Sequence, residues 1–156
     1  MKTTTFLLVD GDSSTVSAAG RGFLMAPPGT KFKVVENGVE AYQYLRGAGP
    51  YSDREAYPIP DFVLVRVGSG QGLDFLGWLR EKAPEACRQI PVIILSSCGL
   101  SEELERARKL AVSLFLLEPI DWAKFWAHLE RADSHAQAST QRARIMDPVG
   151  NLSRVP

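Results

Sequence analysis

Five apolar runs, rich in β-branched and aromatic residues, recur along the chain. They cover residues 6–9, 32–35, 62–67, 92–95 and 114–117. Each run is nearly continuous rather than alternating, which is typical of parallel strands covered on both faces. The intervening and following segments repeat apolar residues at helical spacing, over residues 16–24, 39–45, 73–79, 104–111 and 122–129. This alternation predicts an α/β fold, with a doubly wound five-stranded parallel sheet and right-handed crossovers.

The length of 156 residues and the hydrophobic content of 45% predict one domain with a full core. We assign this domain to residues 1–132. Residues 133–156 are rich in Ser, Ala, Gln and Arg without a sustained apolar period, which favours a mobile tail. Residues 47–60 hold two glycine-flanked turns and three prolines, and predict a long loop before the third strand.

The charge balance excludes some classes of partner. Eighteen basic and eighteen acidic residues cancel, so no overall cationic field draws the protein to nucleic acid or to an anionic membrane. The first apolar stretch is far shorter than a membrane span of about 20 residues, and we expect a cytoplasmic protein. Cys87 and Cys98 fall in predicted loops without the Cys or His spacing of a metal site, which favours reduced thiols.

Polar residues follow the predicted strands. Asp10 and Asp12 come after the first strand, Arg66 ends the third, Ser96 follows the fourth and Glu118 follows the fifth. Ligands of doubly wound sheets bind outside the carboxyl ends of the strands. The pattern therefore predicts that these side chains frame one site.

This frame resembles the receiver domain of bacterial response regulators, the CheY-like superfamily with a (βα)5 flavodoxin-like fold. In that family an acidic pair follows the first strand and a phosphoryl-accepting Asp ends the third. A Ser or Thr ends the fourth strand, and a Lys before Pro ends the fifth. The resemblance places Asp10 and Gly11 at the acidic pair, Arg66 at the acceptor, Ser96 at the hydroxyl and Glu118 at the lysine. Relative to the family, a positive charge thus stands at the acceptor position and a negative charge at the lysine position.

The resemblance extends to three further features. Phe115 matches the family's aromatic whose rotation reports activation, and Pro119 matches a proline that commonly follows a cis peptide bond. Residues 47–60 resemble the extended loop of the single-domain subgroup associated with phytochrome kinases. The resemblance therefore implies a degenerate receiver, closest to that subgroup.

The exchanged charges change the expected chemistry. Arg66 stays protonated and offers no nucleophile, so it cannot accept a phosphoryl group. Asp10 alone keeps its place in the acidic pair, with Asp12 one position late, and we expect no bound metal or other cofactor. We predict that Glu118 holds the Arg66 guanidinium, with Asp10 as a second acceptor. In the alternative, Arg66 and Glu118 both point to water and contribute little.

The resemblance implies a stand-alone pseudo-receiver in two-component phosphorelay signalling, without enzymatic activity. It implies binding to a histidine kinase or a downstream target through the face of the fourth helix, fifth strand and fifth helix, or homodimerisation there. One alternative is a module that senses a small anion or nucleotide with Arg66. A further alternative is a receiver phosphorylated at Asp10 or Asp12.

Overall fold

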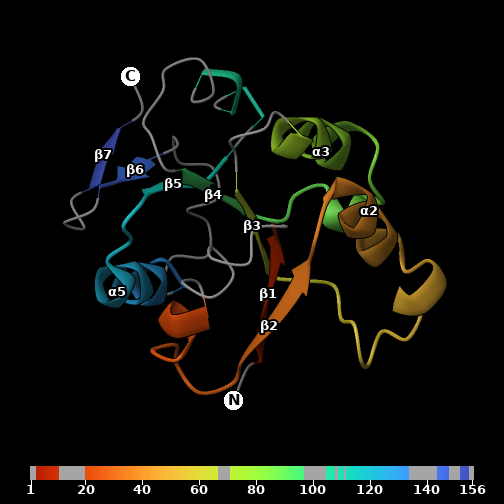
Figure 1. Cartoon of the computed structure of the whole chain (residues 1–156), viewed down its shortest axis with the longest axis horizontal. Helices are drawn as coiled ribbons and strands as arrows, with labels where there is room; N and C mark the ends of the chain where they lie inside the picture. The colour runs from red at the N-terminus through yellow and green to blue at the C-terminus, as the bar shows by residue number, and fades with distance from the viewer. Residues whose placement is uncertain are drawn as a thin grey trace.

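A seven-stranded sheet forms the centre of the described part of the chain, in the order β2-β1-β3-β4-β5-β6-β7 (Figure 1). The structure, a computed structural model, describes residues 3–10, 20–66, 71–96, 105–107, 109–110, 112–133, 144–147 and 152–154. The strands are β1 (Thr4–Val9), β2 (Thr30–Val35), β3 (Phe62–Arg66), β4 (Val92–Ser96), β5 (Leu114–Leu117), β6 (Arg144–Met146) and β7 (Leu152–Arg154). The helices are α2 (Gly38–Arg46), α3 (Gln71–Glu81) and α5 (Trp122–Asp133), with short 3-10 helices η1 (Gly49–Tyr51) and η2 (Glu85–Cys87).

The five predicted strands are present and all pair in parallel, which confirms the predicted fold class. Alternate residues of each strand enter different core clusters. In β1, Leu7 and Val9 belong to the cluster that includes residues of α2 and α3, while Phe6 and Leu8 belong to the cluster that includes residues of α5. Because both faces of β1, β3, β4 and β5 are covered, these strands are nearly continuous apolar runs, whereas the edge strand β2 includes the exposed Val34.

The helices cover opposite faces of this sheet: α2 and α3 lie on one side and α5 on the other (Figure 1). Helix α2 begins where Asn37 Oδ1 accepts a hydrogen bond of 2.9 Å from the backbone N–H of Glu40. Such a cap satisfies a backbone donor that has no partner within the helix. Two residues of the predicted helical patterns lie outside the core, since Leu24 is 86% exposed and Val39 is 62% exposed. Leu24 follows the last helical residue of its segment, and Val39 lies in the first turn of α2.

Strands β6 and β7 correct the expectation of a mobile tail for the described part of residues 133–156. β6 pairs in parallel with β5, and β7 pairs antiparallel with β6. Met146 is only 2% exposed and joins the core cluster on the α5 side. Strands of three residues are too short to show an apolar period, so the sequence pattern did not reveal them.

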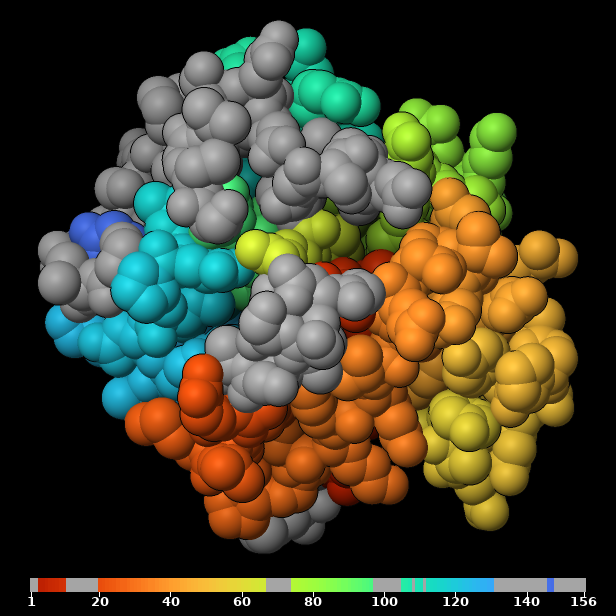
Figure 2. All heavy atoms as spheres, viewed as in Figure 1, coloured from red at the N-terminus to blue at the C-terminus, as the bar shows by residue number. Residues whose placement is uncertain are grey.

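The long loop before β3, residues 47–60, packs closely against α2. It lies at the surface beside this helix, in gold in Figure 2. The rings of Tyr44, Tyr51 and Tyr57 contact one another, with centroid distances of 5.1–5.9 Å. Burial raises the pKa of Tyr44 to about 12, so its hydroxyl stays protonated and donates a 3.0 Å hydrogen bond to the carbonyl of Pro58. The loop is therefore a packed part of the core's edge.

Replacing Gly22 with alanine is expected to lower the free energy of unfolding by about 1–2 kcal/mol, because the added Cβ forces the core to shift. A Cβ at this position would overlap the indole ring of Trp122. The Gly22 carbonyl also accepts a 2.9 Å hydrogen bond from Nε1 of Trp126. Urea denaturation measures the change. Gly20→Ala is the matched control, since nothing lies within 4 Å of its Cβ, and equal stability of the two variants would contradict the prediction.

Candidate functional site

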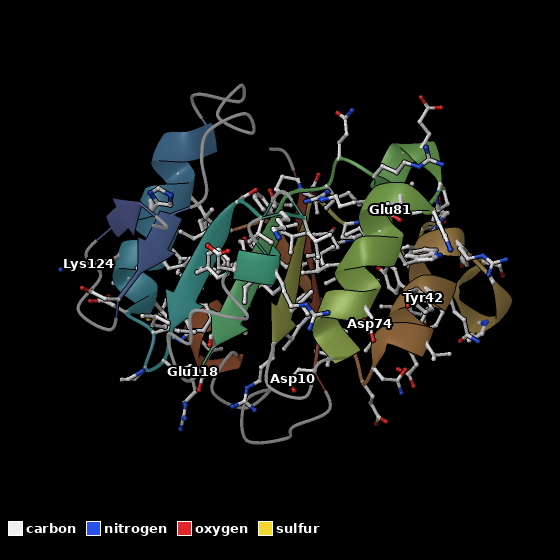
Figure 3. The ribbon with its side chains drawn as sticks, turned by 90° about the horizontal axis from the view of Figure 1, so that it is seen from above. Asp10, Tyr42, Asp74, Glu81, Glu118 and Lys124 are labelled. Carbon is white, nitrogen blue, oxygen red and sulfur yellow. The ribbon has the colours of Figure 1, made fainter. Side chains whose placement is uncertain are left out.

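Four of the predicted site residues come together at the carboxyl ends of the parallel strands. Arg66 ends β3 and Ser96 ends β4, while Asp10 and Glu118 directly follow β1 and β5. Figure 3 shows Asp10 and Glu118 at the same edge of the sheet. The backbone N–H of Glu118 donates a 2.9 Å hydrogen bond to the carbonyl of Ser96, which fixes the end of β5 beside β4. Gly11 and Asp12 lie outside the described residues.

Arg66 and Glu118 form an ion pair, with Nε of Arg66 3.5 Å from Oε1 of Glu118. The predicted contact is thus confirmed. The separation exceeds the 2.7–2.9 Å or so of a short charge-assisted hydrogen bond, so the attraction is mainly Coulombic. β4 lies between β3 and β5, and the pair therefore bridges across the end of β4. The side chains are 24% and 30% exposed, which limits their screening by water.

The other side chains of this edge are more deeply buried. Asp10 is 9% exposed and Ser96 is 3% exposed. The backbone N–H of Asp10 donates a 3.0 Å hydrogen bond to the carbonyl of Val35, which anchors the end of β1 to β2. A carboxylate and a hydroxyl that are this buried need polar partners nearby. They lie at the same sheet edge as the ion pair.

Phe115 and Pro119 occupy the places that the resemblance implied. Phe115 lies in β5, is 1% exposed and belongs to the core cluster on the α2 and α3 side. The peptide bond between Glu118 and Pro119 is cis, which confirms that prediction. The role of Phe115 as a switch remains a prediction.

The donor set formed by the described residues of this edge does not suit a divalent cation. Magnesium requires several oxygen ligands, and the Arg66 guanidinium, which shares the edge with Asp10 and Glu118, would repel a cation there. Among the residues that the structure describes, no three His, Cys, Asp or Glu side chains are grouped to hold a metal. Arg66 also supplies no oxygen nucleophile. No metal-assisted phosphoryl transfer can therefore be derived from the described residues.

Cys87 is a buried thiol in η2 with no sign of a catalytic environment. Its Sγ lies 3.7 Å from the carbonyl oxygen of Leu45. Burial raises the pKa of this thiol, with a smaller opposing effect from Arg54. A raised pKa keeps the thiol protonated and unreactive, and Cys87 is free of any disulfide. Cys98 lies outside the described residues.

The described helices include none that is both long enough and apolar enough to cross a membrane.

Comparisons with known proteins found similarity in structure. No protein-family model matches the sequence, and no curated protein matches it. Solved structures of response regulators do match. A response regulator of red-light signalling from R. palustris superposes with a TM-score of 0.68 at 22% identity, covering 85% of this chain and 92% of that one.

Two further solved structures have the same fold. The phosphorylated cyanobacterial phytochrome response regulator RcpA has a TM-score of 0.68 at 16% identity, covering 90% of this chain and 99% of its own. A two-component response regulator from Legionella pneumophila has a TM-score of 0.70 at 20% identity. The match covers 84% of this chain and 98% of that one. The chain therefore has the flavodoxin-like fold of receiver domains.

Proposed function

We propose that this chain is a receiver-like signalling protein that acts by binding other proteins, without phosphorylation and without enzymatic activity. The observation that carries the proposal is the ion pair between Arg66 and Glu118, 3.5 Å apart at the site edge. It joins the acceptor and lysine positions of the receiver family with the charges reversed. In this proposal the pair holds the ends of β3 and β5 in one arrangement.

The neighbours in structure support the signalling context. Two of them are named as regulators of red-light or phytochrome signalling, and the packed loop 47–60 fits the phytochrome-associated subgroup. We infer a cytoplasmic protein whose partner is a histidine kinase or a downstream target. The receiver-like unit of the proposal is residues 1–132, to which β6 and β7 are added.

Beryllofluoride with magnesium is expected to leave the melting temperature unchanged. Beryllofluoride mimics a phosphoryl group on an aspartate in the presence of a divalent cation, and Arg66 supplies neither the carboxylate nor a cation site. A ligand present at 100 times its Kd would raise the unfolding free energy by about 2.7 kcal/mol. Differential scanning fluorimetry with and without the reagents detects such a change.

Two outcomes would contradict this proposal. A magnesium-dependent rise in melting temperature would mean that Asp10 or Asp12 is an acceptor. A rise with phosphate alone, lost in Arg66→Met, would mean that Arg66 senses an anion. Magnesium chloride alone and sodium chloride at equal ionic strength are the controls.

A further inference from the structure

Strand β6 pairs with the outer edge of β5, a strand of the partner-binding face that the family resemblance implies. The two strands pair in parallel, with Leu114 opposite Arg144, Phe115 opposite Ile145 and Leu116 opposite Met146. β7 then covers the outer side of β6 (Figure 1). The edge of β5 is therefore filled by a segment of the same chain.

Met146 anchors β6 to the rest of the molecule. It is 2% exposed and belongs to the core cluster that includes Leu114, Leu116, Phe125 and Trp126. These residues lie on β5 and on α5. Met146 thus belongs to a core cluster that includes residues of β5 and α5, two elements of the partner-binding face that the resemblance implies.

The attachment of β6 is small compared with the central pairings. Three residues of β6 are in register with β5, whereas six residues of β1 are in register with β2. Short peripheral segments with few buried anchors open at lower free energy than the core of a sheet. Opening of β6 would leave β5 with an unpaired edge beside apolar side chains, which is a template for another strand.

We propose that β6 and β7 form a releasable cover of the β5 edge, and that the partner which replaces them is an extended peptide segment. That segment would add to β5 as a parallel strand and place an unbranched apolar side chain where Met146 lies. The pairing of β6 defines the expected partner segment. β6 runs parallel to β5, and its Met146 side chain enters the core cluster, so a replacing strand should have the same direction and a similar side chain. This inference rests on the proposed function, and it adds a means of regulating it.

Hydrogen exchange in the full chain tests whether the cover opens. In the unmodified protein, the β5 amides that donate to β6 and the amides of β6 are expected to exchange at least tenfold faster than those of Phe6–Val9 in β1. Met146→Asp should accelerate them at least tenfold further and leave the β1 amides unchanged, because a buried carboxylate opposes docking. Met146→Leu is the matched control and should behave as the parent does.

A labelled peptide with the sequence of residues 141–156 tests the uncovered edge. It is expected to bind full-length Met146→Asp at least tenfold more tightly than it binds the parent, measured by fluorescence anisotropy. The same peptide with Asp at the position of Met146 should not bind.

Two results would overturn the inference. One is exchange of the β5 and β6 amides at the rate of the β1 amides in the unmodified protein, since the cover would then open only on global unfolding. The other is equal binding of the peptide to the parent and to Met146→Asp. Either result leaves the beryllofluoride test unaffected, so failure of the cover is distinct from failure of the proposed function.

Discussion

Arg66→Asp is expected to lower the free energy of unfolding by about 2–3 kcal/mol, through loss of one attraction and gain of like-charge repulsion. The substitution removes the ion pair with Glu118 and places a third carboxylate at an edge that already holds Asp10 and Glu118. Because both members of the pair are less than one-third exposed, water screens them only partly. For a domain of this size, such a loss lowers the melting temperature by about 4–12 °C.

A second charge reversal provides the decisive control. In the double variant Arg66→Asp with Glu118→Lys, the two side chains have opposite charges again, so most of the lost stability should return. A double-mutant cycle, measured by thermal and urea denaturation, isolates the interaction between the two positions. If Arg66→Asp melts at the temperature of the parent, or if the second substitution restores nothing, the pair does not hold the strand ends together.

Salt dependence adds an independent readout of the same pair. Raising the ionic strength should narrow the difference in free energy of unfolding between the parent and Arg66→Asp. Salt screens the repulsion between the carboxylates that this substitution brings together. A purely steric effect of the shorter side chain would not depend on salt. The comparison therefore separates an electrostatic cause from a packing cause.

Arg54→Met is expected to lower the free energy of unfolding by about 2–3 kcal/mol, since it removes charged hydrogen bonds to backbone carbonyls. Nη1 of Arg54 donates to the carbonyls of Tyr44 at 2.8 Å and Tyr57 at 3.2 Å, and Nη2 donates to that of Leu45 at 2.7 Å. Tyr44 and Leu45 lie in the last turn of α2, where a positive charge is favourable, and the Tyr44 carbonyl also accepts a 3.1 Å hydrogen bond from the backbone N–H of Gly47. The guanidinium thus joins the loop 47–60 to the helix.

Lysine at this position separates charge from geometry. Arg54→Lys keeps the charge but cannot match the fork of donors, so it should recover only part of the loss, about 1 kcal/mol. Urea denaturation of both variants measures the difference. Full recovery by lysine would show that the charge alone matters, and an unchanged Arg54→Met would show that the three hydrogen bonds add nothing to stability.

The sequence pattern determined the five parallel strands, their order of occurrence and the edge where the site lies. Strands buried on both faces require continuous apolar runs, and the polar residue after each run must lie at the carboxyl end of its strand. The placing of Asp10, Arg66, Ser96 and Glu118 at one edge follows from these local rules. The contact between Arg66 and Glu118 was predictable because their charges are opposite. In the receiver domains that the sequence resembles, the two corresponding positions also face each other.

The tertiary structure alone decided the features that depend on contacts between distant segments. In the sequence, Gly22 is an ordinary small residue. Only the structure shows that a Cβ at this position would overlap the ring of Trp122. In the sequence, Arg54 is a charged residue in a loop. Only the structure shows that it donates hydrogen bonds to carbonyls in the last turn of α2. Neither residue leaves a periodic signal, because its partner is set by folding and not by spacing along the chain.

The strands β6 and β7 make the same distinction most clearly. Three residues carry no recognisable period, and the composition of residues 133–156 as a whole, rich in Ser, Ala, Gln and Arg, favours a mobile tail. They become strands because β5 offers an unpaired edge and the core on the α5 side receives Met146. The local sequence pattern determines the elements that bury apolar faces of their own. A strand that is stabilised mainly by pairing with the edge of another strand depends on the tertiary structure, because that edge forms only when the sheet has folded.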